Sequence, residues 1–235
     1  MGRVVKRPEV RKREILETAR QFFFQKGYDE TSIQDIIGKL DIAKGTFYHY
    51  FTSKIELLDE LTERMTSEIS ASLKQLLDSP MNAVDKFNAV IRNAIAVKLA
   101  NIDVLPVLLR VIFRDENAIV REKMYRRIVE KNTEVFSAII KQGVEEGLFS
   151  TPDPEDAGEV ILELGKALNE KVSRLLLVRG KTVEELIGDI KKKTELYEQM
   201  IERILGAAEG SIRVYLARDF EDMVRLIKKN LREQP

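Results

Sequence analysis

The amino-acid sequence predicts an all-α protein, and two observations carry that prediction. Apolar residues recur at intervals of three and four positions almost everywhere, which is the spacing of a buried helix face and not of a strand. Glycine (12) and proline (6) are sparse among the 235 residues, as expected when tight turns are few. A chain of this length, with 44% apolar residues, can bury roughly 70% of the surface that unfolding exposes. We therefore expect a globular fold, either one large domain or one small and one larger domain.

Three helices are expected at the start of the chain. The first covers residues 8–26 and stops at Gly27, a residue type that commonly ends helices. The second follows Ser32, whose hydroxyl can cap free backbone N–H groups while Asp35 completes a capping box. The third covers residues 44–51.

Seven further helices are expected in the remainder of the chain. Ser53, Thr182 and Ser211 are the predicted N-caps of three of them. Residues 212–215 alternate in a way that also fits a strand, but helical spacing continues across them, so we assign a helix. The expected ranges are 54–78, 81–101, 104–114, 117–146, 154–179, 182–208 and 211–231.

Composition excludes several classes of chemistry. The chain has no cysteine, which removes disulfides, thiolate metal sites and cysteine nucleophiles, and its single histidine, His49, removes sites that need two imidazoles. We therefore expect no catalytic residue, no metal and no cofactor, and the protein is not predicted to be an enzyme. The N-terminus lacks an apolar stretch behind its basic residues, and no apolar run is long enough to span a bilayer, so we expect a cytoplasmic protein without a membrane partner.

Charge is unevenly divided along the chain. Lysine plus arginine equals aspartate plus glutamate at 39 each, so the whole chain carries no net field toward nucleic acid. Residues 1–55 nevertheless hold 11 basic against 7 acidic side chains. Most of the excess lies in the first thirteen residues, which include Arg3, Lys6 and Arg7. The N-terminal fifth is therefore the part of the chain suited to an anionic partner.

Residues 31–54 predict two short helices joined by a tight turn, the unit that places its second helix in the major groove of DNA. If Phe47 and Phe51 point inward, a rotation of about 100° per residue puts Gly45 and His49 on the opposite face. Such a face offers donors for phosphate oxygens and base edges, and surface aromatics gathered on so short a helix call for a partner. The residues that flank Gly45 and His49 are Lys44, Thr46, Tyr48 and Tyr50.

At these residues the chain resembles the TetR family of bacterial transcriptional regulators. The match covers about residues 10–60, with two departures: the turn position usually held by glycine is Asp41, and the usual serine before the second helix is Ala43. Aspartate tolerates the left-handed conformation, so the turn should survive, whereas loss of the serine cap should weaken the helix start by about 1 kcal/mol. The family pattern is matched by Gly45, Thr46, Phe47, Tyr48, Phe51 and Lys54.

The resemblance implies a helix-turn-helix DNA-binding domain over residues 1–53 and a helical ligand-binding and dimerisation domain over residues 54–235. It also implies that Lys44 and Thr46 lie against DNA, with Tyr48 and Lys54 on phosphates. The candidate DNA-binding residues are Ser32, Lys44, Gly45, Thr46, Tyr48, His49, Tyr50 and Lys54.

Beyond residue 60 the resemblance is architectural only, and it implies a small-molecule effector and a homodimer. Polar residues within apolar helices are candidate effector ligands, although a snorkelling or partly exposed side chain is the more common role for such residues. The candidates are Asn93, Arg110, Phe113 and Asn169.

A seam of apolar residues spaced four and three apart runs from Val183 to Ala208. It can pack inside one chain or between two copies, and a two-fold DNA site favours a dimer. We place the dimer surface on the eighth and ninth helices, at Leu164, Leu168, Ile190, Tyr197, Ile201 and Ile204.

The sequence therefore predicts a ligand-responsive DNA-binding transcriptional regulator. A repressor is favoured, released from a pseudo-palindromic operator in double-stranded DNA when a small apolar or amphipathic effector binds. An activator or a DNA-binding scaffold controlled by a protein partner stays open. A helical enzyme with a DNA-binding head is less favoured, since the residues form no catalytic constellation.

Overall fold

The computed structural model describes residues 7–214 and 217–233, and it is all-α as predicted. These residues form ten α-helices and one short 3-10 turn, without a strand among them. Across the same part of the chain, no helix combines the length and the apolar character needed to cross a bilayer.

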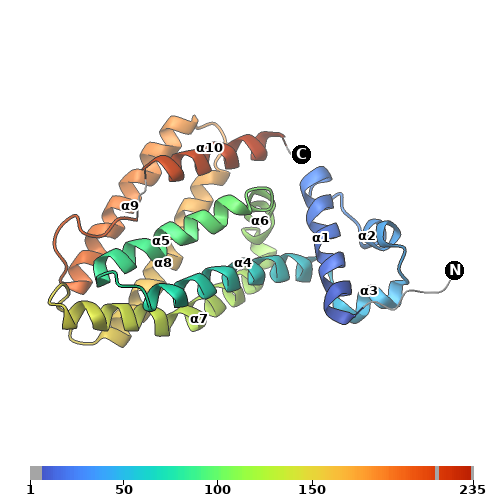
Figure 1. Cartoon of the computed structure of the whole chain (residues 1–235). Coiled ribbons are helices and arrows are strands. Elements are labelled where there is room, and N and C mark those ends of the chain that lie inside the picture. Colours follow the sequence, from blue (N-terminus) through green and yellow to red (C-terminus); the bar gives the residue numbers. More distant parts are fainter. Residues whose placement is uncertain (1–6, 215–216, 234–235) are drawn as a thin grey trace.

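The first three helices form a head at one end of the molecule (Figure 1). They are α1 (Pro8–Lys26), α2 (Ile33–Leu40) and α3 (Lys44–Tyr50); the predicted ranges of α1 and α3 and the predicted start of α2 are confirmed to within a residue. The capping box at the start of α2 is also confirmed, because Ser32 and Asp35 each bind the backbone N–H of the other. The head packs on the beginning of α4 (Lys54–Leu77), which carries the chain into the larger helical part.

The larger part continues from α4 through six more helices. The longest, α7, packs along both α4 and α8, while α10 returns across α6 and α9. A 3-10 turn at Asp115–Asn117 leads into α7. The bounds are α5 (Ala83–Ala100), α6 (Leu105–Ile112), α7 (Ala118–Glu145), α8 (Pro154–Leu177), α9 (Val183–Leu205) and α10 (Ala217–Glu233).

Two predicted features of the tenth helix are wrong. Residues 211–214 are not helical, and the hydroxyl of Ser211 binds the carbonyl of Ala208 instead of capping a helix. The segment is held by side chains distant in sequence. The backbone N–H of Ile212 donates to a Glu202 carboxylate oxygen at 3.1 Å. Such tertiary bonds satisfy backbone groups that a helix would otherwise use, and apolar spacing carries no sign of them.

The predicted cap at the start of α4 is also wrong in detail. Ser53 occupies the N-cap position, but its side chain makes no capping hydrogen bond. The carboxylate of Glu56 instead accepts from both the backbone N–H and the hydroxyl of Thr52. A glutamate in the first turn also suits the positive end of the helix dipole.

The interior contains two apolar clusters. One joins the head to the first half of α4, α6 and α10, and includes Ile15, Phe47 and Leu58. The other joins the second half of α4 to α5, α7, α8 and α9, and includes Phe87 and Ile139. Because the first cluster runs from the head into α4, α6 and α10, the packing of these helices bears directly on the position of the head.

The predicted apolar seam of α9 is real, but it lies inside one chain. Ile190, Tyr197 and Ile201 are buried by the other helices of the same chain, as is Leu168 of α8. Ile204 is half-buried against the second cluster. The four buried residues therefore cannot form the dimer surface as predicted, because their side chains are already covered by the fold, and Ile204 is partly covered.

Candidate nucleic-acid interface

The turn between α2 and α3 is formed by Asp41. This residue ends α2 in the left-handed region, with φ 48° and ψ 53°, so the expectation that aspartate supports the turn is confirmed. The backbone N–H of Ile42 then donates to the carbonyl of Ile37 at 3.2 Å. Ala43 precedes α3 without a side-chain cap, as expected for alanine in place of serine.

Two aromatic residues fix the rotation of α3. Phe47 and Phe51 are both buried in the first cluster, with ring centroids 6.1 Å apart. Lys44, Gly45 and His49 are consequently exposed on the outer side of the helix. The orientation predicted from helical spacing is therefore confirmed.

The outer side of α3 is rich in aromatic and cationic groups. The ammonium of Lys44 lies 5.8 Å from the centroid of the Tyr48 ring, and 42% of Tyr48 is exposed. The rings of His49 and Tyr50 meet edge to face at 4.9 Å. Tyr50 is half-buried against the first cluster, and Thr46 is also half-buried. Lys44, Tyr48 and His49 are thus the side chains best placed to meet a partner.

Gly45 has no packing reason to be glycine. A Cβ built on it meets no atom within 4 Å, and its φ is not in the left-handed region. Glycine in a helix normally costs stability relative to alanine. The open space therefore fits a position where another molecule approaches the backbone.

Ser32 and Lys54 are already bound to the chain itself. The hydroxyl of Ser32 donates to Asp35 at 2.7 Å and accepts from the backbone N–H of Asp35 at 3.1 Å. The ammonium of Lys54 donates to the carbonyls of Tyr28 at 2.6 Å and Thr31 at 2.9 Å. Lys54 therefore closes the loop between α1 and α2, a role that sequence reasoning missed. Its contact with a phosphate would require it to leave these carbonyls.

Ion pairs join the head to the larger part. Arg20 of α1 binds both carboxylate oxygens of Asp103, at 2.8 and 2.7 Å. Arg114, just after α6, binds Asp29 in the loop between α1 and α2 at 2.9 Å and holds the pKa of that carboxyl below its usual range. The head is therefore tied to both ends of the α6 region.

The predicted effector residues do not form one site. Arg110 lines a small pocket of about 170 Å³ between α6 and the loop after α1, and it donates to the backbone carbonyl of Leu231. Phe113 packs against the first cluster beneath the guanidinium of Arg121. Asn93 is half-buried on α5 and takes part in none of these contacts.

Asn169 belongs to an internal chain of hydrogen bonds between three helices. Its carbonyl oxygen accepts from the ammonium of Lys98 on α5 at 3.1 Å, and its amide donates to the hydroxyl of Tyr125 on α7 at 2.9 Å. Lys98 and Tyr125 were not among the predicted residues. Lys98 interrupts the apolar run at the end of α5 much as Arg110 interrupts α6, and that signal could have identified it.

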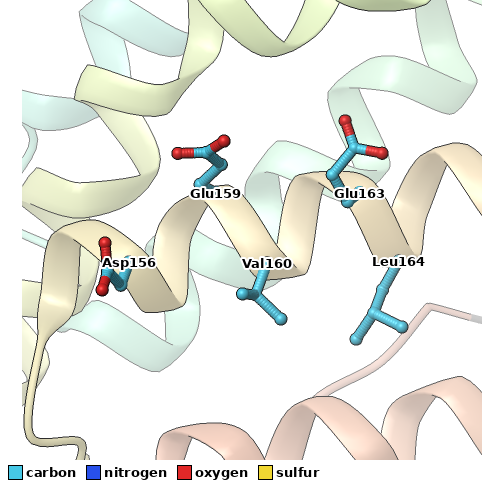
Figure 2. A pocket seen from close by; sticks show the side chains of 5 residues that line it. All are labelled: Asp156, Glu159, Val160, Glu163 and Leu164. Atoms are coloured by element: carbon cyan, nitrogen blue, oxygen red, sulfur yellow. The ribbon is translucent and has the colours of Figure 1, made fainter.

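The outer side of α8 carries exposed apolar side chains beside acidic ones. A surface hollow of about 430 Å³ is lined by Asp156, Glu159, Val160, Glu163 and Leu164. Figure 2 shows Val160 and Leu164 on one side of the helix and the carboxylates of Glu159 and Glu163 on the other. Of the predicted dimer residues, Leu164 is therefore the one on an outward face.

The basic segment at the start of the chain stays a prediction, since Arg3 and Lys6 lie outside the described residues. Within the part that is described, a short helix anchored by Phe47 and Phe51 presents hydrogen-bond donors outward behind a tight turn. This arrangement places a recognition helix in the major groove of DNA. The fold and this face define a helix-turn-helix DNA-binding protein.

Comparisons with known proteins identify the family. Residues 15–61 match the family described as bacterial regulatory proteins, tetR family. Over 163 residues the chain is 30% identical to the HTH-type transcriptional regulator YhgD of Bacillus subtilis, covering 67% of this chain and 82% of that protein. It is 27% identical over 154 residues to the HTH-type transcriptional repressor KstR2 of Mycobacterium tuberculosis, covering 63% and 74%.

A solved structure extends the likeness over most of the chain. The structure of RolR in complex with resorcinol superposes with a TM-score of 0.57 at 16% identity, covering 93% of each chain, so the two share a fold. The chain belongs to the TetR family of bacterial transcriptional regulators. It is a DNA-binding regulator of transcription.

Proposed function

We propose that this protein is a dimeric repressor that leaves its pseudo-palindromic operator when a small apolar or amphipathic effector binds. KstR2 is a transcriptional repressor, and the RolR structure holds a small aromatic ligand, which supports both parts of the proposal. We assign DNA binding to residues 1–53 and effector binding and dimerisation to residues 54–235. The boundary falls at the start of α4, the helix that joins the two parts.

The outer side of α3 carries the proposal. It is exposed, it holds Lys44, Tyr48 and His49, and it includes a glycine for which the fold itself has no need. Cationic and hydroxyl donors bind phosphate, and imidazole can also read base edges in the major groove. One helix of this length contacts few base pairs, so two copies on a two-fold site supply the affinity and the specificity.

The ion pairs between the head and the α6 region give the effector a route to the DNA. Arg20 with Asp103 and Arg114 with Asp29 tie α1 and the following loop to the segments on either side of α6. An effector that binds one position of α6 more tightly than another shifts the population of head positions. The two recognition helices of a dimer then no longer fit half-sites one turn of DNA apart.

The first test of the proposed function measures transcription from a promoter that carries an operator selected by the protein. The wild-type protein would be used to select an operator from a random-sequence pool, and that operator would be placed over a promoter in a purified transcription reaction. We expect the transcript to decrease as protein is added. An increase would identify an activator. Failure to select any sequence from the pool would contradict specific DNA binding.

Gly45 and Gly38 supply a matched pair of variants for the same reaction. Both are helical glycines, and a Cβ at either meets no atom within 4 Å, but only Gly45 lies on α3. Alanine at either position should raise the free energy of unfolding by up to about 1 kcal/mol. We expect G45A to lose repression while G38A keeps it. Equal repression by both variants would remove the backbone of α3 from the interface.

Tyr48 and His49 should contribute in different ways. Tyr48→Phe removes one phosphate hydrogen bond, so affinity should fall by about 1 to 2 kcal/mol on the selected operator and on unrelated DNA alike. His49→Ala should also relax base preference, measured as the ratio of the two affinities by fluorescence anisotropy. Unchanged affinity and unchanged ratio in both variants would contradict this placement of the recognition face.

A further inference from the structure

Lys98 is a half-buried cation of the larger helical part. Within the described residues no carboxylate pairs with its ammonium, and its hydrogen-bond partner is the neutral amide of Asn169. Burial lowers the pKa of Lys98, and no acidic neighbour opposes that effect. Lys166, on the same helix as Asn169, provides the contrast, because its ammonium is paired with Glu122 at 3.1 Å and with Glu163 at 3.5 Å. A cation that is partly withdrawn from water without a counter-ion is costly, since charge is normally paired in the interior.

The surroundings of Lys98 hold it in one place. Asn169 is fixed from the other side by Tyr125, whose ring is buried, so the ammonium, the amide and the phenol cross from α5 to α8 to α7. An ammonium has three donors, and Asn169 accepts one of them. Among the described residues, no second acceptor is within hydrogen-bond distance of the ammonium.

Apolar side chains accompany this polar group on the same helix faces. Ala94 lies one turn before Lys98 on α5, and Val172 lies one turn after Asn169 on α8. Ile128 lies one turn after Tyr125 on α7. All three are half-buried, as is Lys98 itself. These partly accessible side chains offer contacts to a small molecule that carries both an anionic group and an apolar body.

We propose that Lys98, positioned by Asn169 and Tyr125, binds the anionic group of an amphipathic organic acid, and that the half-buried apolar residues beside it contact the body of that acid. The inference rests on the proposed effector-controlled function and names the chemical class of the effector. An anion at this position neutralises the half-buried charge and makes charge-assisted hydrogen bonds, which are stronger than neutral ones. A neutral ligand of the same shape lacks that contribution.

The test compares decanoate with decanol on the full chain by calorimetry. The wild-type protein should bind decanoate more tightly than decanol. In Lys98→Met, which keeps the length of the side chain and removes its charge, affinity for decanoate should fall at least about tenfold while affinity for decanol stays unchanged. Lys171→Met, which removes an exposed lysine from the helix that carries Asn169, is the control and should bind both ligands as the wild type does.

Asn169→Asp gives a second, independent variant. It places a carboxylate of the chain itself beside the ammonium of Lys98, so it should also weaken decanoate binding while leaving decanol binding intact. Circular dichroism and thermal melting establish that each variant is folded. A Lys98→Met protein that binds decanoate as the wild type does, or a wild-type protein that fails to prefer decanoate over decanol, would overturn the proposal and leave the three residues as a structural cross-brace.

The result of the calorimetric test can be distinguished from the result of the transcription test of the proposed function. Calorimetry is performed without DNA, so decanoate can bind through Lys98 whether or not the protein represses transcription. Binding that depends on Lys98 without release of the selected operator would support the site and count against control by this class of effector. A protein that selects no operator would refute the proposed repressor without changing the calorimetric result.

Discussion

Replacing both Ile201 and Ile204 with lysine is expected to unfold the larger helical part. Ile201 is 5% exposed, and Ile204 is half-buried against the same cluster, which also contains Leu205 and Ile139. Burying one unpaired charge costs about 3 to 5 kcal/mol, and the stability of a whole domain is about 5 to 15 kcal/mol. Thermal melting followed by circular dichroism should therefore show a collapsed transition and not a folded monomer.

Gln199→Lys is the matched control, because it lies on the same helix and is exposed. It should keep its helical content and its melting temperature within a few degrees of the wild type. If the Ile201 and Ile204 double variant stayed folded as a monomer, the seam of α9 would be an interface between chains after all.

The head could be predicted closely because its signals are local. Gly27 ends α1, Ser32 with Asp35 starts α2, and Asp41 takes the left-handed turn, each within a few residues of the feature that it sets. The outward face of α3 follows in the same way from Phe47 and the rotation of a helix. Tertiary contacts elsewhere in the chain do not alter these choices.

The predictions for the start of the tenth helix and for the role of the α9 seam were wrong for a different reason. Apolar spacing shows that a face is buried but not what covers it, so Ile190 and Tyr197 fitted an internal core and a dimer equally well. Residues 211–214 carry helical spacing, yet distant partners such as Glu202 and Asn88 bind their backbone. Periodicity cannot register bonds formed across such distances in sequence.

The candidate sites show the same difference between local signals and contacts that depend on the fold. Tyr48 and His49 could be assigned from their position on one short helix, whereas the involvement of Lys54 with three backbone carbonyls depends on the loop after α1. Lys98 and Tyr125 meet Asn169 only because α5, α7 and α8 pack together. Asn169 was found as a polar residue in an apolar helix, but its partners required the fold.

The apolar residues left exposed on α8 and α9 offer a surface for a second copy. Val160 is 49% exposed, Leu196 is 55% exposed and Met200 is 39% exposed, while Leu164 on α8 is half-buried. Exposed apolar groups on packed neighbouring helices are typical of a site for protein association.

Replacing Val160 and Leu196 together with glutamate is therefore expected to separate the proposed dimer without unfolding the chain. Both side chains are about half in solvent, so the charges need not be buried in the monomer. In a two-fold interface each new carboxylate is brought toward those of the other copy, and on α8 it joins Glu159 and Glu163. Light scattering should show a mass that falls from two chains to one.

Loss of the dimer should remove operator binding, because one recognition helix alone engages only half of the site. Linking two half-site contacts raises affinity by about a hundredfold or more, so the double variant should lose at least that much on the selected operator. Ile119→Glu is the control. Ile119 lies on α7 and is 73% exposed, so this variant should keep both the mass and the operator affinity of the wild type. A Val160 and Leu196 double variant that remains dimeric and still binds the operator would place the interface elsewhere, on α10 or along α7.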